Sequence, residues 1–288
     1  MRVSEKIVPL LSWVCGIVLL AAITGVMGFL FYQGWQSLNP RLIFGTTPPW
    51  DAVMLRQRVL NGLFPAMAGT FLLVCLAVSW AVPVGIAAGI YLAEYAGGKT
   101  RKFLNMIFDV LAGLPSIVIG LFGLSITIYL NNHLSTRIYP CLLISSVALA
   151  FLVLPYTIRA TQTALERQPV SLRMTAPALG ASKLQNIIRV LLPQSLSGIM
   201  SGVILATGRC AEDTAVIMLT GAVAMGGIPH SLLSNYEALP FYIYYISSQY
   251  ADREELAMGY GAAIILLFIC LVLFSLAFFI QKRMRRFM

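Results

Sequence analysis

The feature that most constrains this chain is a set of six long runs without a charged side chain. Each run can supply the roughly 20 apolar residues that an α-helix needs to cross about 30 Å of hydrocarbon. A soluble domain of this length would bury its apolar residues in shorter amphipathic stretches. The runs are 7–40, 66–93, 110–135, 138–158, 190–208 with a continuation past residue 213, and 256–280.

The composition agrees with embedding in a membrane. Hydrophobic residues make up 59% of the 288 residues and charged residues 11%, whereas soluble domains average about 25% charged residues. The runs are continuous rather than alternating, which favours helices over a β-barrel, because a spanning helix satisfies its own backbone hydrogen bonds. We therefore predict an all-α integral membrane protein with six transmembrane helices.

The positions of lysine and arginine predict the orientation in the membrane. If the N-terminus is cytoplasmic, fourteen basic residues fall on the inner side and five on the outer side, and Arg209 remains inside the membrane. This bias follows the positive-inside rule, so both termini are expected in the cytoplasm. The net charge of +9 then reflects a surface that faces anionic membrane lipid, and nucleic acid is not an expected partner.

The chain shows no residue pattern typical of an enzyme or a metal site. The five cysteines are scattered singly, and neither of the two histidines has a carboxylate or a cysteine at metal-ligand spacing. The GKT sequence at 98–100 lacks the first glycine of a phosphate-binding loop and follows a membrane helix instead of a strand. We expect no catalytic residue, metal or cofactor in this chain, and a basic loop at 98–100.

Three ionisable residues interrupt the fifth run. Arg209, Glu212 and Asp213 lie in the stretch TGRCAEDTA at 207–215, with long uncharged sequence on both sides. A charged side chain at the bilayer centre costs roughly 2.5–3.5 kcal/mol on insertion scales, so it usually faces the protein interior or a water-filled path. On a helix, Arg209 lies one turn from both carboxylates and can pair with either. A structural ion pair at a helix interface and a role in a transport path both remain open.

A long inner loop at about 159–193 connects the fourth and fifth helices. Pro169 predicts a helix start and Gly180 predicts a break. Helical periodicity resumes at Lys183 and continues up to Pro193. One or two short amphipathic helices are expected, which either rest on lipid or fit a groove of a partner protein. Their exposed apolar residues would include Leu172, Met174, Ala176 and Leu179.

This loop resembles the cytoplasmic coupling motif of type I ATP-binding-cassette (ABC) importer permeases. In that motif an acidic residue and two alanines precede a glycine, and a Leu-Pro pair follows. Here Gly180 and Leu192-Pro193 stand at the family's spacing, whereas Met174 occupies the acidic position. The resemblance implies that contact with the ATPase is made by Arg173, Met174, Ala176, Ala178, Leu179, Gly180 and Pro193.

Four further stretches resemble the permeases of phosphate importers. They are YLAEYA at 91–96, GLPSIVIGLFG at 113–123, GRCAEDTA at 208–215 and ALPFYIY at 238–244. The last stretch, followed by a final helix and a basic end, is similar to the PstA-type subunit more than to its PstC-type partner. The aligned family stretch has glycine at position 212 and glutamate at position 213, so Glu212 gives this chain one extra carboxylate.

The resemblance implies a type I ABC importer permease bundle of six transmembrane helices with a cytoplasmic coupling helix, in the bacterial cytoplasmic (inner) membrane. The implied partners are a second, PstC-like permease, a PstB-like ATPase dimer that holds ATP and Mg, and an external PstS-like phosphate-binding protein. Arg209 would line the anion path, because its guanidinium matches phosphate oxygens. A permease for sulfate or molybdate is the alternative, and a secondary transporter is a more distant one.

The expected organisation has three parts. Residues 1–65 hold the first helix and an outer loop, 66–281 form the permease core, and 282–288 form a basic cytoplasmic tail. The outer loop at 39–65 and the stretch at 242–255 are expected to receive the binding protein. The outer loop offers Trp50, Arg56 and Arg58 for that contact.

Small residues and prolines refine the expected helix packing. The glycine pairs at 85–89 and 198–202 are small-xxx-small motifs, which either permit close helix approach or are incidental in a glycine-rich chain. Kinks or short breaks inside spans are expected at prolines. The prolines concerned are Pro83, Pro115 and Pro155.

Overall fold

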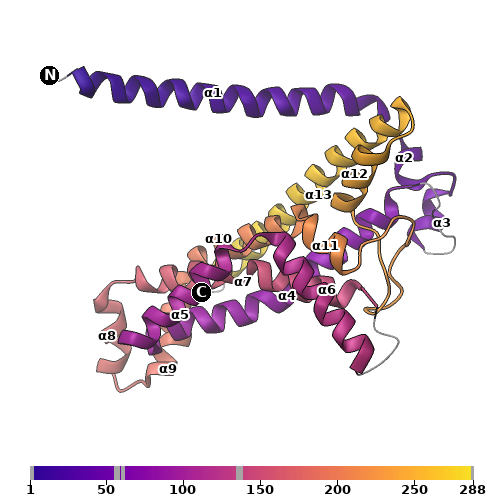
Figure 1. Cartoon of the computed structure of the whole chain (residues 1–288). Helices are drawn as coiled ribbons and strands as arrows, with labels where there is room; N and C mark the ends of the chain where they lie inside the picture. Colours follow the sequence, from indigo (N-terminus) through magenta and orange to yellow (C-terminus); the bar gives the residue numbers. More distant parts are fainter. Residues whose placement is uncertain (1–2, 55–58, 60–61, 134–138, 287–288) are drawn as a thin grey trace.

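A computed structural model gives the fold (Figure 1) and describes residues 3–54, 59, 62–133 and 139–286. The described residues form helices, with one isolated β-bridge between Ala222 and Tyr236. Six helices are long and apolar enough to span a membrane, which confirms the predicted number. These spans are Val8–Ser37, Phe64–Tyr95, Ser116–His133, Leu142–Glu166, Lys183–Glu212 and Arg253–Arg283.

Shorter helices lie between the spanning ones. A 3-10 turn, η1, follows the first helix, and two π-helical turns, η2 and η3, adjoin α4 and α10. The elements in chain order are α1 (Val3–Gly34), η1 (Trp35–Ser37), α2 (Pro40–Phe44), α3 (Pro49–Val53), α4 (Phe64–Ile90), η2 (Tyr91–Tyr95), α5 (Gly98–Gly113), α6 (Ser116–His133), α7 (Leu142–Glu166), α8 (Val170–Ala178), α9 (Lys183–Asn186), η3 (Ile187–Leu191), α10 (Leu192–Glu212), α11 (Ala215–Thr220), α12 (Leu239–Gln249) and α13 (Arg253–Arg286).

The prolines divide the third predicted span but not its neighbours. Pro83 and Pro155 lie inside α4 and α7. Pro115 separates α5 from α6, because the residue before a proline is driven to extended backbone and Leu114 adopts φ −68° and ψ 133°. The third span therefore begins at Ser116 rather than at residue 110. The expected basic loop at 98–100 is wrong, since these residues begin α5.

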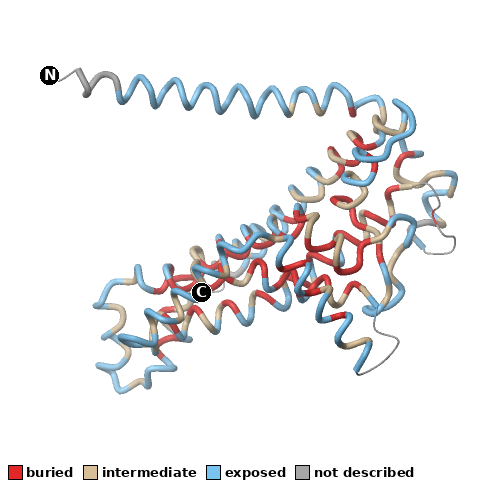
Figure 2. Tube along the Cα trace, viewed as in Figure 1, coloured by how far each residue is buried: buried red, intermediate tan, exposed pale blue. Residues whose placement is uncertain are grey.

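Helix α7 lies at the centre of the bundle between α4 and α10 (Figures 1 and 2). Both glycine pairs pack against it. A Cβ atom added to Gly85 would lie 1.9 Å from Thr157 Oγ1, and one added to Gly202 would lie 2.2 Å from Ala160 Cβ. These distances are far below van der Waals contact, so both motifs are sites of close helix approach rather than incidental glycines.

Helix α1 stands apart from the bundle (Figure 1). The C-terminal end of α1 contacts α13, where Phe29 packs edge-to-face on Tyr260 with ring centroids 5.8 Å apart. Its described side chains before residue 27 are exposed and mostly apolar (Figure 2). Such a helix is stable only where lipid or another chain covers it.

The bundle has two distinct ends (Figure 1). Helices α8 and α9 lie at one end, called here the loop end, and the C-terminal end of α13 lies toward it. Helices α2, α3 and α12 lie at the other, called the far end. The spanning helices connect the two, so residues at the middle of α7 lie at mid-depth of the bundle.

Candidate functional site

Arg209 lies on α10 at mid-depth of the bundle. Helices α10 and α7 are antiparallel, because the glycines of 198–202 pack in turn on Ala164 and Ala160. Continuing this register places Arg209 level with Val153, near the middle of α7. The charge therefore lies at the depth where a charged side chain is most costly in lipid.

Arg209 pairs with Glu212. The Arg209 Nη1 and Glu212 Oε1 atoms are 3.2 Å apart, and the two side chains are 43% and 62% exposed. Asp213 is buried instead, and its Oδ1 accepts a hydrogen bond of 2.8 Å from the backbone N–H of Val216. Glu212 therefore lies on the exposed face together with Arg209, whereas Asp213 is buried and accepts a hydrogen bond from the backbone.

Asp213 marks a break that sequence reasoning did not place. Helix α10 ends at Glu212 and the short α11 begins at Ala215, with Asp213 in extended backbone at φ −73° and ψ 123°. The first N–H groups of a helix have no partner within the helix, and an aspartate just before the first turn is a preferred acceptor for them. The Asp213-Thr214 pair was the available signal for this helix start.

The coupling loop begins as its sequence predicts. Helix α8 starts after Pro169, and the break falls at Gly180, whose φ of +81° lies in the left-handed region that glycine adopts at little cost. Helix α9 then starts at Lys183. Ser182 and Gln185 form a capping box there, in which each side chain bonds the other's backbone N–H.

The helix continues past Pro193, where the sequence suggested a boundary. The π-helical turn η3 joins α9 to α10, and Pro193 falls in the first turn of α10. Proline has no N–H, and its ring clashes with the carbonyl four residues earlier in an α-helix. The wider π turn just before the proline relieves that conflict, so α9, η3 and α10 form one continuous helical segment.

Two of the four expected exposures in this part of the coupling loop are wrong, because Leu172 and Ala176 are half-buried. Met174 and Leu179 are exposed by 64% and 86%, as expected. Leu172, however, is half-buried and packs with Leu165 and Ile187. Leu172 lies on the face of α8 that packs against the spanning helices. Which face of α8 packs there is set by contacts with distant residues and cannot be predicted from the sequence of α8 alone.

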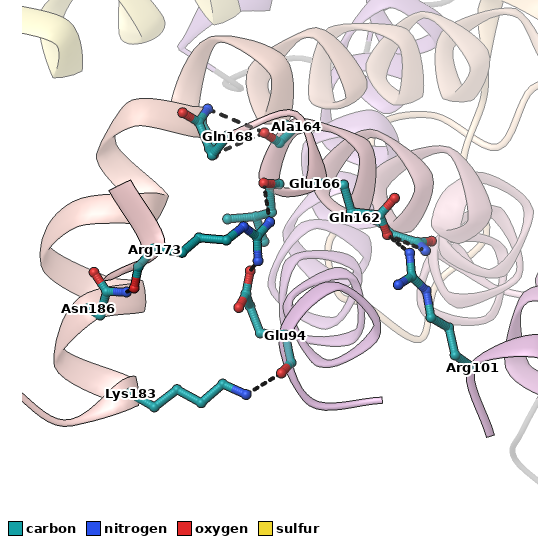
Figure 3. A network of polar contacts seen from close by, with 11 residues as sticks. Glu94, Arg101, Gln162, Ala164, Glu166, Gln168, Arg173, Lys183 and Asn186 are labelled. Carbon is teal, nitrogen blue, oxygen red and sulfur yellow. Dashed lines mark hydrogen bonds and ion pairs between the residues drawn. The ribbon is translucent and has the colours of Figure 1, made fainter. Parts of the chain in front are cut away.

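Charged and amide side chains tie α8 and α9 to the loop end (Figure 3). Arg173 forms an ion pair with Glu94 and donates a 2.7 Å hydrogen bond to the Leu165 carbonyl. The Arg173 carbonyl accepts a 2.9 Å bond from Asn186 Nδ2. Lys183 donates to the Glu94 carbonyl. Arg173, expected at an ATPase contact, thus points at the chain's own membrane domain.

A second polar group joins α5 to α7 at the same end. Arg101 pairs with Glu166, which also accepts a 2.8 Å hydrogen bond from Gln162 Nε2. Arg159 pairs with Asp109 in the same manner. Neither pair includes a residue of α8 or α9, so this group does not hold those two helices in place.

The far end holds a cavity of about 770 Å³. Its walls come from the segments 223–230 and 237–258 and from four residues nearer the N-terminus, Leu42, Val59, Gly62 and Pro65. The outer loop at 39–65 and the stretch at 242–255, identified separately in the sequence, therefore border one hollow. Trp50 is 67% exposed, whereas Arg56 and Arg58 lie outside the described residues.

Carboxylates give this cavity its polar character. Glu237 and Glu255 both line it, and the Glu237 Oε1 accepts a 2.8 Å hydrogen bond from the Gly227 N–H. Burial raises the pKa of Glu237, and the bond from Gly227 offsets part of that rise. Burial also raises the pKa of Tyr242, with smaller contributions from the charges of Glu255 and Glu237. Among the described residues no group of His, Cys, Asp and Glu is arranged to hold a metal ion.

Residues 85–286 match the family described as "Binding-protein-dependent transport system inner membrane component". The chain is 32% identical to the phosphate transport system permease protein PstA of Haemophilus influenzae, over 98% of its own length and 96% of that protein. It is 35% identical to PstA of Yersinia pestis, over 85% of its own length and 78% of that protein.

The fold resembles a chain of a solved bacterial alginate ABC transporter in complex with an alginate pentasaccharide-bound periplasmic protein. The TM-score is 0.65, the identity is 18%, and 99% of both chains is covered. At that identity the likeness concerns the fold alone.

Proposed function

The chain belongs to the family of inner membrane components of binding-protein-dependent transport systems, and from that premise we propose that it is the permease subunit of an ATP-driven phosphate importer. The substrate comes from its similarity to two phosphate transport permeases. The observation that carries the mechanism is the exposed guanidinium of Arg209 in the last turn of α10, level with the middle of α7. As a multi-pass inner membrane protein, the chain supplies half of the path.

The face of α10 that bears Arg209 borders the path. Ser201, Leu205, Arg209 and Glu212 are exposed at successive turns of this helix. A charged side chain at mid-bilayer costs roughly 2.5–3.5 kcal/mol in lipid, so a second permease and an aqueous path cover this face. The five N–H donors of a guanidinium form a fork that matches phosphate oxygens.

The two carboxylates leave Arg209 available to an anion. The Glu212 pair is exposed, and exposed pairs contribute only about 0–1 kcal/mol, so phosphate can replace Glu212 as the partner of Arg209. The buried Asp213 is engaged with the Val216 N–H and faces away from the path. The extra carboxylate of this chain is therefore a competing partner for Arg209 rather than a barrier in the path.

The remaining surfaces are assigned to partners. The coupling loop docks on a PstB-like ATPase dimer through the exposed Met174 and Leu179, and that dimer binds ATP and Mg. The far-end cavity receives a PstS-like phosphate-binding protein, and a PstC-like permease completes the path. The Lys and Arg bias supports cytoplasmic termini. The core at 66–281 performs these roles, between residues 1–65 and the basic tail at 282–288.

The test is phosphate uptake by the reconstituted complex carrying Arg209→Gln. Uptake should be lost while the second permease and the ATPase still co-purify. The matched control is Glu212→Gln, which breaks the same ion pair but keeps the guanidinium, and it should retain uptake. Equal loss in both variants would make the pair structural, and normal uptake by Arg209→Gln would remove this residue from the path.

The substrate is tested separately. ATP hydrolysis by the complex, in the presence of the binding protein, should be stimulated by phosphate and not by sulfate or molybdate. Stimulation by one of those oxyanions alone would keep the architecture and replace the substrate.

A further inference from the structure

Helix α8 is joined to the spanning helices by few side chains. None of its residues is buried, and it packs mainly on α9 and η3. Leu172 and Arg173 turn toward the bundle, whereas Met174 and Leu179 are exposed. A movement of α8 therefore reaches the membrane domain through a small number of identifiable contacts.

Glu94 receives a cationic group from each half of the coupling loop (Figure 3). Its carboxylate pairs with Arg173 of α8, and its backbone carbonyl accepts a hydrogen bond from Lys183 of α9. The Lys183 ammonium also lies 4.5 Å from the centroid of the Tyr95 ring. The two helices on either side of Gly180 thus hold the same residue of η2.

The Arg173–Glu94 pair is shielded from water. The Glu94 side chain is 9% exposed and that of Arg173 is 25% exposed. A buried charge that loses its partner is strongly disfavoured, so such a pair resists separation. The Arg101–Glu166 pair at the same end is more exposed, at 38% and 36%, and includes no residue of α8 or α9.

Glu94 also sits at the end of a helix that is locked to the centre of the bundle. Helix α4 packs on α7 through Gly85 and Gly89, which face Thr157 and Thr161. The π-helical turn η2 lies between that contact and the loop end. Single π-helical turns are frequent at functional sites, and this one carries the anchor of the coupling loop.

We propose that Glu94 is the positioning residue that carries movement of the coupling loop into α4, and so links ATP hydrolysis on a partner chain to the opening of the path. The inference rests on the proposed function, in which α8 docks on an ATPase. Docking uses the exposed side chains of α8, so neutralising Glu94 leaves docking in place and removes the link to α4.

The experiment measures phosphate uptake and ATP hydrolysis in proteoliposomes that hold the full complex, with phosphate-loaded binding protein. Glu94→Gln, which keeps the size of the side chain, should still co-purify with the ATPase and hydrolyse ATP. Phosphate transported per ATP hydrolysed should fall by about fivefold or more. The matched control Glu166→Gln, which breaks the Arg101 pair, should keep the wild-type ratio. The double variant Glu94→Arg, Arg173→Glu exchanges the two charges, and it should transport more phosphate per ATP hydrolysed than Glu94→Gln does.

Three results would overturn the inference. A wild-type ratio in Glu94→Gln would show that α4 is not driven through this residue. An equal fall in Glu166→Gln would reduce the effect to general loosening of the loop end. Loss of the ATPase from the Glu94→Gln complex would make the residue a docking determinant instead. Failure of the proposed function looks different, because the wild-type complex itself would then show neither phosphate uptake nor phosphate-stimulated hydrolysis.

Discussion

The contact between Gly202 of α10 and Ala160 of α7 should limit the stability of the bundle. A Cβ atom added to Gly202 would lie 2.2 Å from Ala160 Cβ, whereas carbon atoms in contact are about 3.5–4.0 Å apart. Gly202→Ala therefore requires the two helices to move apart by roughly 1 Å or more at this contact. Overpacking of this kind costs about 1–3 kcal/mol.

A second substitution isolates the contact. Ala160→Gly removes the opposing methyl group, after which the nearest remaining atom to the new Cβ is the Tyr156 carbonyl oxygen at 3.4 Å, an ordinary contact. Alone, Ala160→Gly should cost about 1 kcal/mol through its lower helix propensity. Combined with Gly202→Ala it moves the methyl from one helix to the other, so the double variant should be more stable than the sum of the single effects predicts, by about 0.5–3 kcal/mol.

The assay is thermal unfolding of the purified chain in detergent, followed with a thiol-reactive dye that reaches the buried Cys141 and Cys210 when the bundle opens. Gly25→Ala on α1 is the control, because a Cβ there meets nothing within 4 Å. Gly202→Ala should lower the midpoint by a few degrees, at about 2–4 °C per kcal/mol for chains of comparable size. Strictly additive effects of the two substitutions would refute close packing at this contact.

Two further predictions concern carboxylates. Asp213→Ala should destabilise the α10–α11 junction by about 1 kcal/mol, because it removes the acceptor of the Val216 N–H; Asp213→Asn keeps an acceptor and should retain phosphate uptake, so loss of uptake in the Asn variant would instead give this charge a direct role. Burial raises the pKa of Glu237 above its ordinary value of 4.5, so the stability that this group contributes is complete below pH 4.5 and is lost as the pH rises through the folded-state pKa. The unfolding midpoint of the wild type should therefore fall between acidic and neutral pH, and Glu237→Gln should make that fall smaller. Identical pH profiles of the midpoint in variant and wild type would contradict this prediction.

The number and order of the membrane spans can be predicted from the sequence because each span corresponds to a long uncharged run. Six uncharged runs are enough to place six spans, since the cost of charge in lipid acts on every residue of a run. Pro169 and Gly180 bound α8 for local reasons, namely a missing N–H and a positive φ. The break after Glu212 has only a two-residue signal, Asp213-Thr214, inside an otherwise apolar stretch, and was missed.

Contacts between distant segments could not be read from one sequence. Arg173 and Glu94 are separated by 79 residues, and nothing in either local sequence selects the other as a partner. The inward orientation of Leu172 has the same origin, because one turn of α8 could rotate either face to the bundle. Arg209 pairs with Glu212 and not with Asp213 because α10 ends at Glu212, so Asp213 is no longer one helical turn from Arg209.

The two π-helical turns have a consequence for the chain's ancestry. A π-helical turn accommodates one residue more than the α-helical turn it replaces, so η2 and η3 are places where a single residue can be gained or lost without breaking the flanking helices. An insertion elsewhere in α4 would rotate every later residue of that helix by about 100° around the helix axis, which would carry Glu94 away from Arg173. Related chains of different length are thus expected to differ by single-residue gaps at 91–95 and 187–191, while the residues that meet at the coupling loop keep their partners.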